Sequence, residues 1–262
     1  MILEAKSISA GYGGDPVIRN ISIRIETGRI VGVLGPNGSG KTTLLRALSG
    51  LIPFTGETLR VDDRDLSSFS PRKRARLIAW VHQRETSPFA FTVRQWVEMG
   101  RFCHTGYISP ASDRDLAAVD GALSTCNLQS LAERPLLHLS GGEAQRAHIA
   151  RALAQDAGML FLDEPLTHLD LRYQDEIYHI LRKLARQDQR ALLCVLHDLD
   201  FAAAFCDEVL CLKNGQTFAS GNADEVLTPE TLSRLYDVRI IQKDRSLAPS
   251  FTRTTRKDLR DE

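Results

Sequence analysis

The nine residues GPNGSGKTT, at positions 35–43, constrain the fold of this chain more than any other stretch. They match the pattern G-x-x-x-x-G-K-[ST] and lie between a continuous apolar run at 29–34 and a segment of helical character at 41–48. This order of strand, glycine-rich turn and helix predicts a loop whose backbone N–H groups face phosphate groups at a helix N-terminus. We therefore expect the chain to bind a nucleotide.

The residue types of this phosphate loop define individual roles. Glycines let the backbone curl towards the phosphates, Lys41 can reach the β- and γ-phosphates, and the Thr42 hydroxyl can ligate magnesium. The residues expected to surround the nucleotide are Gly35, Pro36, Asn37, Gly38, Ser39, Gly40, Lys41, Thr42 and Thr43. On its own the loop indicates nucleotide binding and no particular reaction.

A pair of acids follows a second apolar run. Residues 159–162 lead directly into Asp163 and Glu164, and the C-terminal end of a buried strand is where an α/β sheet places its ligand chemistry. Asp163 suits the magnesium shell, usually through water, and Glu164 can polarise the attacking water as a general base. Alone, such a pair would as readily be a solvated loop, but beside a phosphate loop the catalytic interpretation is favoured.

The stretch LSGGE at 139–143 precedes a helical pattern. Ser140 and Glu143 have the spacing of a capping box, which is a sufficient structural explanation by itself. Gly141 and Gly142, however, disfavour a first helical turn, which suggests that something approaches the backbone closely there. A helix N-terminus with a serine hydroxyl is a second candidate γ-phosphate site, and we expect a phosphate to complete the cap.

Apolar periodicity elsewhere predicts an α/β fold interrupted by helices. Strands are expected at residues 2–9, 17–25, 29–34, 159–162, 191–196, 209–213 and 216–219, and helices at 41–48, 93–99, 113–126 and 142–154. The buried strands are each followed by a helical stretch, which favours parallel βα units. The block from about 86 to 150 has the pattern of an inserted helical subdomain, and residues 244–262 that of a loosely held polar tail.

Composition narrows the possible partners. Lys plus Arg and Asp plus Glu number 33 each, and this zero net charge gives no support for a general nucleic-acid binder. Five scattered cysteines without a CxxC pair are typical of small buried side chains in a reducing compartment. The N-terminus lacks a signal-peptide pattern, and no stretch approaches the roughly 18 consecutive apolar residues of a spanning helix. Any membrane role is therefore expected to come through a partner.

In combination these motifs closely resemble the ATP-binding subunits of ABC transporters. The resemblance extends from Tyr12 to about residue 240, and the phosphate loop, LSGGE and the acid pair occur in the family's order. It implies a P-loop NTPase core, the ABC ATPase head, with an N-terminal antiparallel β subdomain and the inserted helical subdomain, all within residues 1–243. It further implies ATP and Mg²⁺ as cofactors and ATP hydrolysis coupled to transport.

The resemblance also gives roles to smaller elements. Tyr12 matches an aromatic ring that stacks on adenine, Gln83 a glutamine that contacts magnesium and water, Asp170 an aspartate of the loop after the acid pair, and His197 a histidine that contacts the γ-phosphate. Each residue alone would more often be ordinary surface or core. The resemblance thus assigns catalysis to Gln83, Glu164 and His197, magnesium to Thr42, Gln83 and Asp163, and further nucleotide contacts to Tyr12, Ser140, Gly141, Gly142 and Asp170.

The partners that the resemblance implies are a second copy of the chain and a membrane permease. Two ATP molecules would be sandwiched head to tail in a homodimer, peripheral to the cytoplasmic face of the membrane, and a periplasmic or lipoprotein substrate-binding protein would act indirectly. No nucleic acid is expected. Residues 84–101 would form the groove that receives the permease. Their apolar residues fit either a docking surface or core packing and are Phe89, Phe91, Val93 and Trp96.

Phrases at 92–101, 167–174 and 227–238 resemble importers of iron chelates (siderophores), haem and cobalamin. A related ATPase for another cargo, such as a metal ion, remains an alternative, as does a DNA-repair or chromosome ATPase. The latter class separates its phosphate loop from LSGGE by a long coiled coil, and the block between Lys41 and Ser140 shows no sustained heptads. A non-hydrolysing, ATP-gated scaffold is the third possibility.

Overall fold

A six-stranded sheet forms the centre of the computed structural model, which describes residues 1–82, 90–105, 110–167, 169–243 and 246–249. Across the sheet the strands are β11 (Gln216–Asn222), β10 (Glu208–Lys213), β3 (Ile30–Leu34), β9 (Ala191–Val195), β8 (Met159–Asp163) and β7 (Ile78–Val81). The five strands from β10 to β7 run parallel, and β11 joins the edge as the second strand of a hairpin with β10. The parallel core expected from the buried runs is confirmed.

The N-terminal strands form a separate antiparallel sheet. It contains β2 (Ile18–Glu26), β1 (Ile2–Ala10), β5 (Thr58–Val61) and β6 (Arg64–Asp65) in that order, with β4 (Phe54–Thr55) also pairing β1. Alternate residues of β1, such as Leu3 and Ala5, are buried on one face. The register with β2 shifts between Ala5 and Ile8, where Ser7 takes a positive φ of 50°. This irregularity keeps Ile8 on the buried face.

Four of the described helices lie where the apolar periodicity placed them. The described helices are α1 (Lys41–Leu48), α2 (Pro71–Leu77), α3 (Val93–Glu98), α4 (Phe102–Thr105), α5 (Asp113–Thr125), α6 (Gly141–Ala154), α7 (Leu171–Arg186), α8 (Leu199–Phe205), α9 (Ala223–Val226) and α10 (Pro229–Tyr236). The four expected helices and six of the seven expected strands agree within one residue at each end, and β11 runs on to Asn222.

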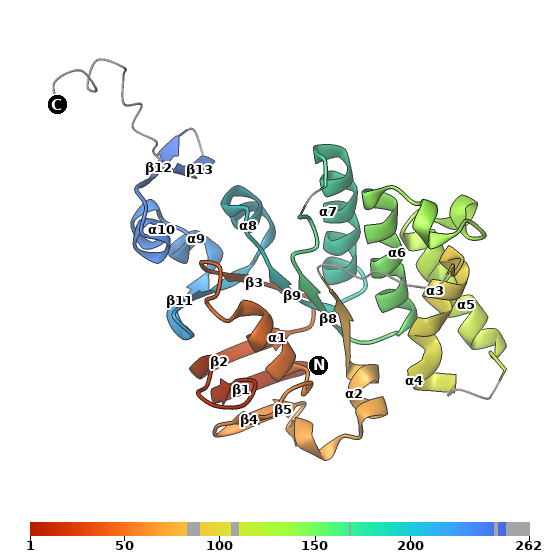
Figure 1. Cartoon of the computed structure of the whole chain (residues 1–262), viewed down its shortest axis with the longest axis horizontal. Helices are drawn as coiled ribbons and strands as arrows, with labels where there is room; N and C mark the ends of the chain where they lie inside the picture. The colour runs from red at the N-terminus through yellow and green to blue at the C-terminus, as the bar shows by residue number, and fades with distance from the viewer. Residues whose placement is uncertain (83–89, 106–109, 168, 244–245, 250–262) are drawn as a thin grey trace.

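Alternate side chains of the central strands face two separate hydrophobic cores, one on each side of the sheet. Val31 and Val33 of β3 face a core shared with α1 and the antiparallel sheet, whereas Ile30 and Leu34 face a core shared with α5, α6 and α7. The same alternation recurs along β8. Helix α1 and helix α6 therefore lie against opposite faces of one sheet, as Figure 1 shows.

A buried arginine, Arg101 in the turn between α3 and α4, links Asp115 of α5 to the C-terminal end of α6. Arg101 and Asp115 approach to 2.8 Å with side chains only 5% and 7% exposed, and Arg101 also donates to the carbonyl of Ala154 at 2.7 Å. The Ser112 hydroxyl and amide donate to Asp115 in a capping box at the start of α5. One carboxylate therefore serves both a helix cap and an interior guanidinium.

The chain after α10 forms a two-stranded antiparallel sheet of β12 (Ile240–Lys243) and β13 (Ser246–Pro249). Division of the chain into a domain over 1–243 and a tail over 244–262 remains a prediction. All five cysteines are free thiols and buried, namely Cys103, Cys126, Cys194, Cys206 and Cys211. Burial in apolar surroundings is what their scattered spacing predicted.

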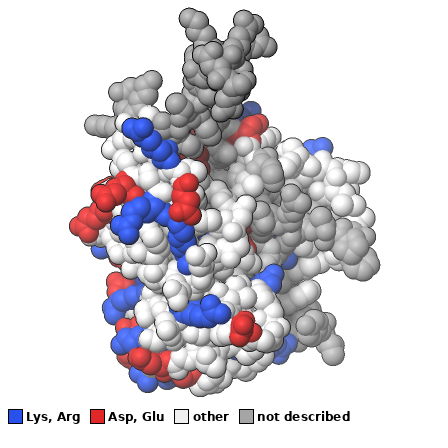
Figure 2. Space-filling view, turned by 60° about the vertical axis from the view of Figure 1, so that its left-hand side comes forward, with Lys and Arg blue, Asp and Glu red and all other residues white. Residues whose placement is uncertain are grey.

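Charged side chains of both signs lie side by side along the left-hand part of the face drawn in Figure 2. Exposed ion pairs such as Arg24–Glu26 contribute little to stability, because water and salt screen them. Within the described ranges, none of the helices combines the length and apolar character needed to cross a bilayer.

Candidate active site

One edge of the central sheet gathers the residues singled out from the sequence. Parallel strands end at a common edge, and the phosphate loop follows β3, His197 follows β9, and Asp163 and Glu164 end β8. Strand β7 also ends at this edge, with Val81. Gln83, two residues further on, lies outside the described residues.

Glycines of the phosphate loop occupy positions that a side chain could not. Gly35 has a φ of 147°, and an added Cβ would lie 2.1 Å from the carbonyl oxygen of Leu212. Gly40 has a φ of 100°, and its Cβ would lie 2.5 Å from Ile18. Gly40 caps α1 without any side-chain hydrogen bond, so the first-turn amides of this helix have no capping side chain. Such an uncapped N-terminus suits an anion.

The side chain of Lys41 folds back towards the start of the phosphate loop. Its ammonium donates to the carbonyl oxygens of Gly35 at 2.8 Å and Pro36 at 3.0 Å, and the residue is 7% exposed. Burial lowers the pKa of Lys41, and the nearby Glu164 and Asp163 act in the opposite direction. A cleft of about 220 Å³ joins the phosphate loop to the acid pair and is lined by Val17, Asn37, Gly38, Gly40, Lys41, Thr42, Thr43 and Glu164.

Asp163 and Thr42 provide the oxygen atoms that magnesium prefers. Burial raises the pKa of Asp163, which is 6% exposed, while a hydrogen bond from the Thr42 hydroxyl lowers it and the adjacent Glu164 raises it further. Within the described ranges, no group of three or more His, Cys, Asp or Glu side chains could hold a metal by itself. The Asp163 carboxylate and the Thr42 hydroxyl fit Mg²⁺, which usually keeps only one or two protein ligands and relies on phosphates and water for the rest.

Glu164 is held by two neighbours. His197 Nε2 lies 2.6 Å from one carboxylate oxygen, and the Thr167 hydroxyl donates to the other at 3.2 Å. The backbone of Glu164 takes a positive φ of 54°, an uncommon conformation for a residue other than glycine, and its amide donates to Val195 of β9. This geometry turns the side chain towards the cleft that also contains Lys41. The sequence reasoning missed Thr167, which has no motif of its own.

The cap at LSGGE is complete within the chain. Ser140 Oγ accepts from the amide of Glu143, and the Glu143 carboxylate accepts from both the amide and the hydroxyl of Ser140 at 2.8 and 2.9 Å. These bonds lower the pKa of Glu143, the backbone amide of Ser140 most of all. The capping box therefore forms within the chain without a phosphate, and a phosphate contact at the remaining first-turn amides stays a prediction.

Gly142 is explained by an aromatic ring. A Cβ at this position would lie 2.2 Å from the ring of Tyr173, so the close approach inferred from the glycines is made by a side chain of α7. Gly141 is different, because among the described residues an added Cβ would meet only Leu169, at 3.9 Å. The backbone at Gly141 therefore remains accessible from outside.

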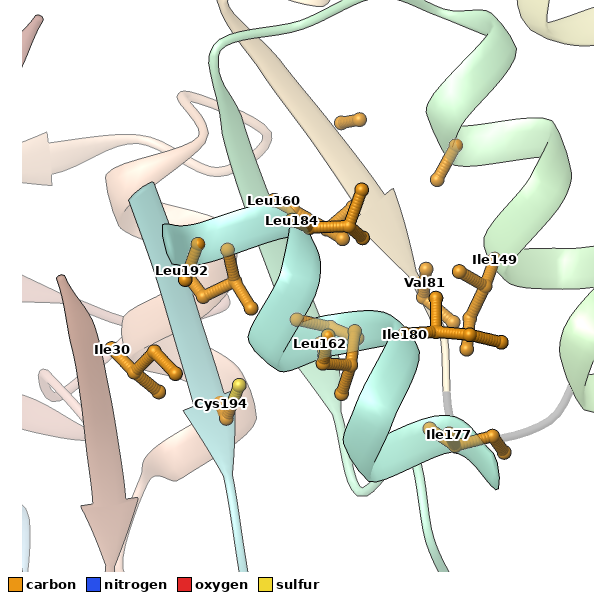
Figure 3. Packing of buried hydrophobic residues seen from close by; sticks show 14 of the residues in the cluster. Ile30, Val81, Ile149, Leu160, Leu162, Ile177, Ile180, Leu184, Leu192 and Cys194 are labelled. Atoms are coloured by element: carbon orange, nitrogen blue, oxygen red, sulfur yellow. The ribbon is translucent and has the colours of Figure 1, made fainter. Parts of the chain in front are cut away.

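Helix α7 fixes Tyr173 and the loop before it. Its buried residues Ile177, Ile180 and Leu184 follow helical spacing and belong to the core cluster on this face of the sheet. In Figure 3, Leu184 lies beside Leu160 of β8, and Ile180 lies beside Val81 of β7 and Ile149 of α6. Asp170 is the N-cap, and its carboxylate accepts from the amide of Tyr173 at 3.0 Å. In this chain Asp170 thus has a structural role independent of any nucleotide contact.

Ser140 does not reach the phosphate cleft of its own chain. None of the residues 139–143 lines the cleft formed by Lys41 and Glu164. Ser140 is exposed and contacts Glu143 and, at 3.4 Å, the hydroxyl of Tyr173. The two candidate phosphate-binding elements are therefore separate within the described structure.

Comparison with known proteins agrees with this arrangement. Residues 18–167, more than half of the chain, match the family model described as ABC transporter. The chain belongs to the ABC transporter family. The matched region includes the phosphate loop, LSGGE and the acid pair.

Two curated relatives and one solved structure indicate the branch of the ABC transporter family. The cobalamin import ATP-binding protein BtuD of Halobacterium salinarum is 41% identical over 92% of this chain, which spans 60% of that relative's length. The iron(3+)-hydroxamate import ATP-binding protein FhuC of Bacillus subtilis is 34% identical to this chain. The match covers 94% of this chain and 93% of the length of FhuC. A metal-chelate type ABC transporter in an inward-facing conformation has a TM-score of 0.83 at 28% identity, covering 95% and 98% of the two chains.

The apolar cluster expected at the permease groove of this ABC transporter chain is largely core. Val93 is fully buried and Trp96 is 7% exposed, while Phe91 packs against the same core from its margin. Phe89 lies outside the described residues. Of the two alternatives, core packing therefore explains Val93 and Trp96.

Tyr12 lies over the first turns of α1 with 56% of its surface exposed. Its hydroxyl accepts from Arg46 at 3.0 Å and from Thr43 at 3.4 Å, and the Arg46 guanidinium lies 5.6 Å from the ring centre. An aromatic ring is thus held at the mouth of the phosphate loop, as the proposed stacking on adenine requires.

Tyr12→Ala is expected to weaken ATP binding by about five- to a hundredfold, because base–aromatic stacking contributes about 1–3 kcal/mol. Titration of the purified chain with a slowly hydrolysed ATP analogue measures this. Tyr12→Phe is the matched control, since it keeps the ring and should bind normally. Equal losses in both variants would assign the effect to the hydroxyl and not to stacking.

Proposed function

We propose that this chain is the ATP-hydrolysing subunit of an importer that energises uptake of an iron chelate (siderophore), haem or cobalamin across the cytoplasmic membrane. The observation that carries the proposal is the convergence of Lys41, Asp163, Glu164 and His197 on one sheet edge. A cation, two carboxylates and an imidazole at one sheet edge are the groups that phosphoryl transfer to water needs.

The residues have distinct chemical tasks. The loop amides and Lys41 bind the β- and γ-phosphates, for which Lys41 exchanges its bonds to the Gly35 and Pro36 carbonyls. Thr42 and Asp163 hold Mg²⁺, which when bound neutralises charge on the phosphates. Glu164 accepts the proton of the attacking water, and His197 fixes the orientation of that carboxylate. Gln83 is assigned a contact with magnesium and water by resemblance alone.

A homodimer accounts for the separation of Ser140 from the phosphate cleft. A head-to-tail pair would place Ser140, with the exposed backbone of Gly141, over the ATP held by the other copy. Because each chain carries one phosphate loop and one LSGGE, two equivalent sites result. ATP then stabilises the closed pair by binding it and not the separated chains, and hydrolysis releases it.

A groove of about 290 Å³ is the best candidate for the permease contact. It begins beside His82, which directly precedes residues 83–89, and its lining includes Trp80 and Arg151, with Leu51 62% exposed at the rim. Its lining residue Arg151 lies over the ring of Trp96, which belongs to the segment 84–101 that the resemblance assigns to this contact. Binding there would place the chain at the cytoplasmic face of the membrane as a peripheral subunit, with a substrate-binding protein acting on the opposite side.

The cargo assignment is supported by the relatives named for cobalamin and iron(3+)-hydroxamate import. Cargo does not contact this subunit in the proposed mechanism. The choice among siderophore, haem and cobalamin therefore depends on the permease and the binding protein.

Gentle purification of the tagged chain from its native membranes tests the proposal. We expect a multi-helix permease to co-purify and the complex to hydrolyse ATP, with Lys41→Ala retaining the permease but losing nucleotide binding. Recovery of only soluble or DNA-associated partners would overturn the transport assignment and leave the ATPase chemistry standing. A wild-type complex without turnover would instead favour the non-hydrolysing scaffold.

A further inference from the structure

Tyr173 of helix α7 contacts the LSGGE stretch at two points. Its ring fills the space beside Gly142, where an added Cβ would lie 2.2 Å from a ring carbon. Its phenol oxygen lies 3.4 Å from Ser140 Oγ. One side chain of α7 thus touches both the N-cap and the first turn of α6.

The position of the Tyr173 ring is itself fixed. Its backbone amide donates to the carboxylate of the N-cap Asp170 at 3.0 Å, and the Arg146 guanidinium of α6 lies 5.6 Å from the ring centre. Arg146 is 7% exposed and forms an ion pair with Glu176, three residues after Tyr173 on α7. An ion pair between the two helices and a cation–π contact therefore keep the phenol of Tyr173 beside Ser140.

Tyr173 is the donor in its bond to Ser140. A serine hydroxyl has one proton and can accept two hydrogen bonds. The Ser140 proton goes to the Glu143 carboxylate at 2.9 Å, and one acceptor site takes the Glu143 amide at 3.4 Å, which leaves the second acceptor site for the Tyr173 hydroxyl. With both acceptor sites in use, Ser140 gains a further partner only by turning its proton towards an acceptor, such as a phosphate oxygen.

Neither Ser140 nor Tyr173 belongs to the phosphate cleft of its own chain. In the described part of the chain, the cleft that contains Lys41 and Glu164 is lined by neither of them, and Ser140 is exposed. A change at Tyr173 therefore leaves in place the contacts that the cleft offers to ATP. An effect of Tyr173 on turnover has to pass through the exposed Ser140 and the second copy that meets it.

Resting on the proposed function, we infer that Tyr173 is a positioning residue for the reaction. Its ring sets the first turn of α6, and its hydroxyl orients Ser140 as a hydrogen-bond donor to the ATP held by a second copy of the chain. Tyr173 acts through Ser140 and does not contact the nucleotide. It thereby favours closure of the dimer around ATP and not the binding of ATP by a separate chain.

Tyr173→Phe removes the hydroxyl and keeps the ring on Gly142. In the Glu164→Gln background at saturating ATP, we expect the dimer dissociation constant from analytical ultracentrifugation to rise about three- to thirtyfold, because each of two equivalent sites loses a hydrogen bond. The affinity of the dilute, separate chain for a slowly hydrolysed ATP analogue and the melting temperature should stay at wild-type values. A merely structural role would give the reverse, a lower melting temperature with unchanged dimerisation.

Tyr178→Phe is the matched control for this measurement. Its phenol lies on the same helix, but it bonds Arg182 and belongs to no site described above. The substitution should leave the dimer dissociation constant and the ATP affinity unchanged.

A double-mutant cycle with Ser140→Ala tests whether Tyr173 acts through Ser140. Once the Ser140 hydroxyl is gone, Tyr173→Phe should have little further effect on dimerisation. Equal losses from Tyr173→Phe with and without that hydroxyl would overturn the inference. If Ser140→Ala weakens the dimer and Tyr173→Phe does not, the proposed function stands and only the inference fails. Normal ATP-dependent dimerisation in Ser140→Ala would overturn the role of Ser140 in the proposed function and the inference with it.

Discussion

Replacing Glu164 by glutamine is expected to reduce ATP turnover by about 10²–10⁴-fold while ATP affinity stays within about twofold of wild type. Glutamine has the size of glutamate and can keep contacts with His197 and Thr167, but it cannot accept a proton from water. Phosphate release at saturating ATP measures the turnover. With hydrolysis blocked, the ATP-bound homodimer should persist in size-exclusion chromatography.

Thr167→Val is the matched control for this result. It removes one hydrogen bond to the same carboxylate and leaves the proton acceptor in place, so turnover should fall by no more than about tenfold. If Glu164→Gln retained a rate within tenfold of wild type, the general base would have to be another group. A loss of ATP binding in Glu164→Gln would instead indicate damage to the cleft.

Asp115→Asn is expected to lower the free energy of unfolding at neutral pH by about 3 kcal/mol, although Asp115 belongs to no part of the active site. The substitution leaves the Arg101 guanidinium buried without its counter-charge, at the place where it also bonds Ala154. Asparagine keeps an oxygen for the Ser112 cap, so the loss isolates the ion pair. Urea denaturation monitored by circular dichroism measures it.

The same pair predicts a pH dependence with a defined sign. The hydrogen bond from the Ser112 hydroxyl, helped by the Ser112 amide and by Arg101, lowers the pKa of Asp115 from 3.8 to about 2. A lowered folded-state pKa means that the stabilisation is complete above about pH 4 and is lost as the pH falls through about 2. The difference in unfolding free energy between wild type and Asp115→Asn should therefore shrink across this window.

Asp120→Asn on the same helix provides the comparison. Asp120 is 62% exposed and pairs with Arg94 at the surface, so its loss should cost less than about 1 kcal/mol. Equal effects of the two substitutions would show that burial of the Arg101–Asp115 pair does not determine its contribution.

Sequence patterns sufficed where the structural cause is local. The phosphate loop, its strand and its helix follow from glycine conformations and from apolar runs that are buried on both faces, and both signals are contained in neighbouring residues. The convergence of Asp163 and His197 beside the loop also followed, because parallel strands end at a common edge. Strand β7 was not predicted, since four residues after a basic helical turn are too short for a distinct period.

Contacts between segments that are distant in the sequence could not be predicted from such local patterns. The tight approach at Gly142 was expected from its helix propensity, but the identity of the approaching group, Tyr173, depends on how α7 packs on the sheet. Val93 and Trp96 have the composition of either a docking surface or a core, and only tertiary packing distinguishes the two.

Because all five cysteines are buried, we expect the folded chain to react very slowly with thiol reagents. Burial raises the pKa of all five thiols, and only the thiolate reacts with such reagents. A cysteine introduced at an exposed position outside the active site, such as Leu116 or Val238, would then be the sole attachment point for a spin label or fluorophore on the folded chain. The separation of two subunits through a cycle of ATP binding could thus be followed by spectroscopy with every native cysteine left in the core.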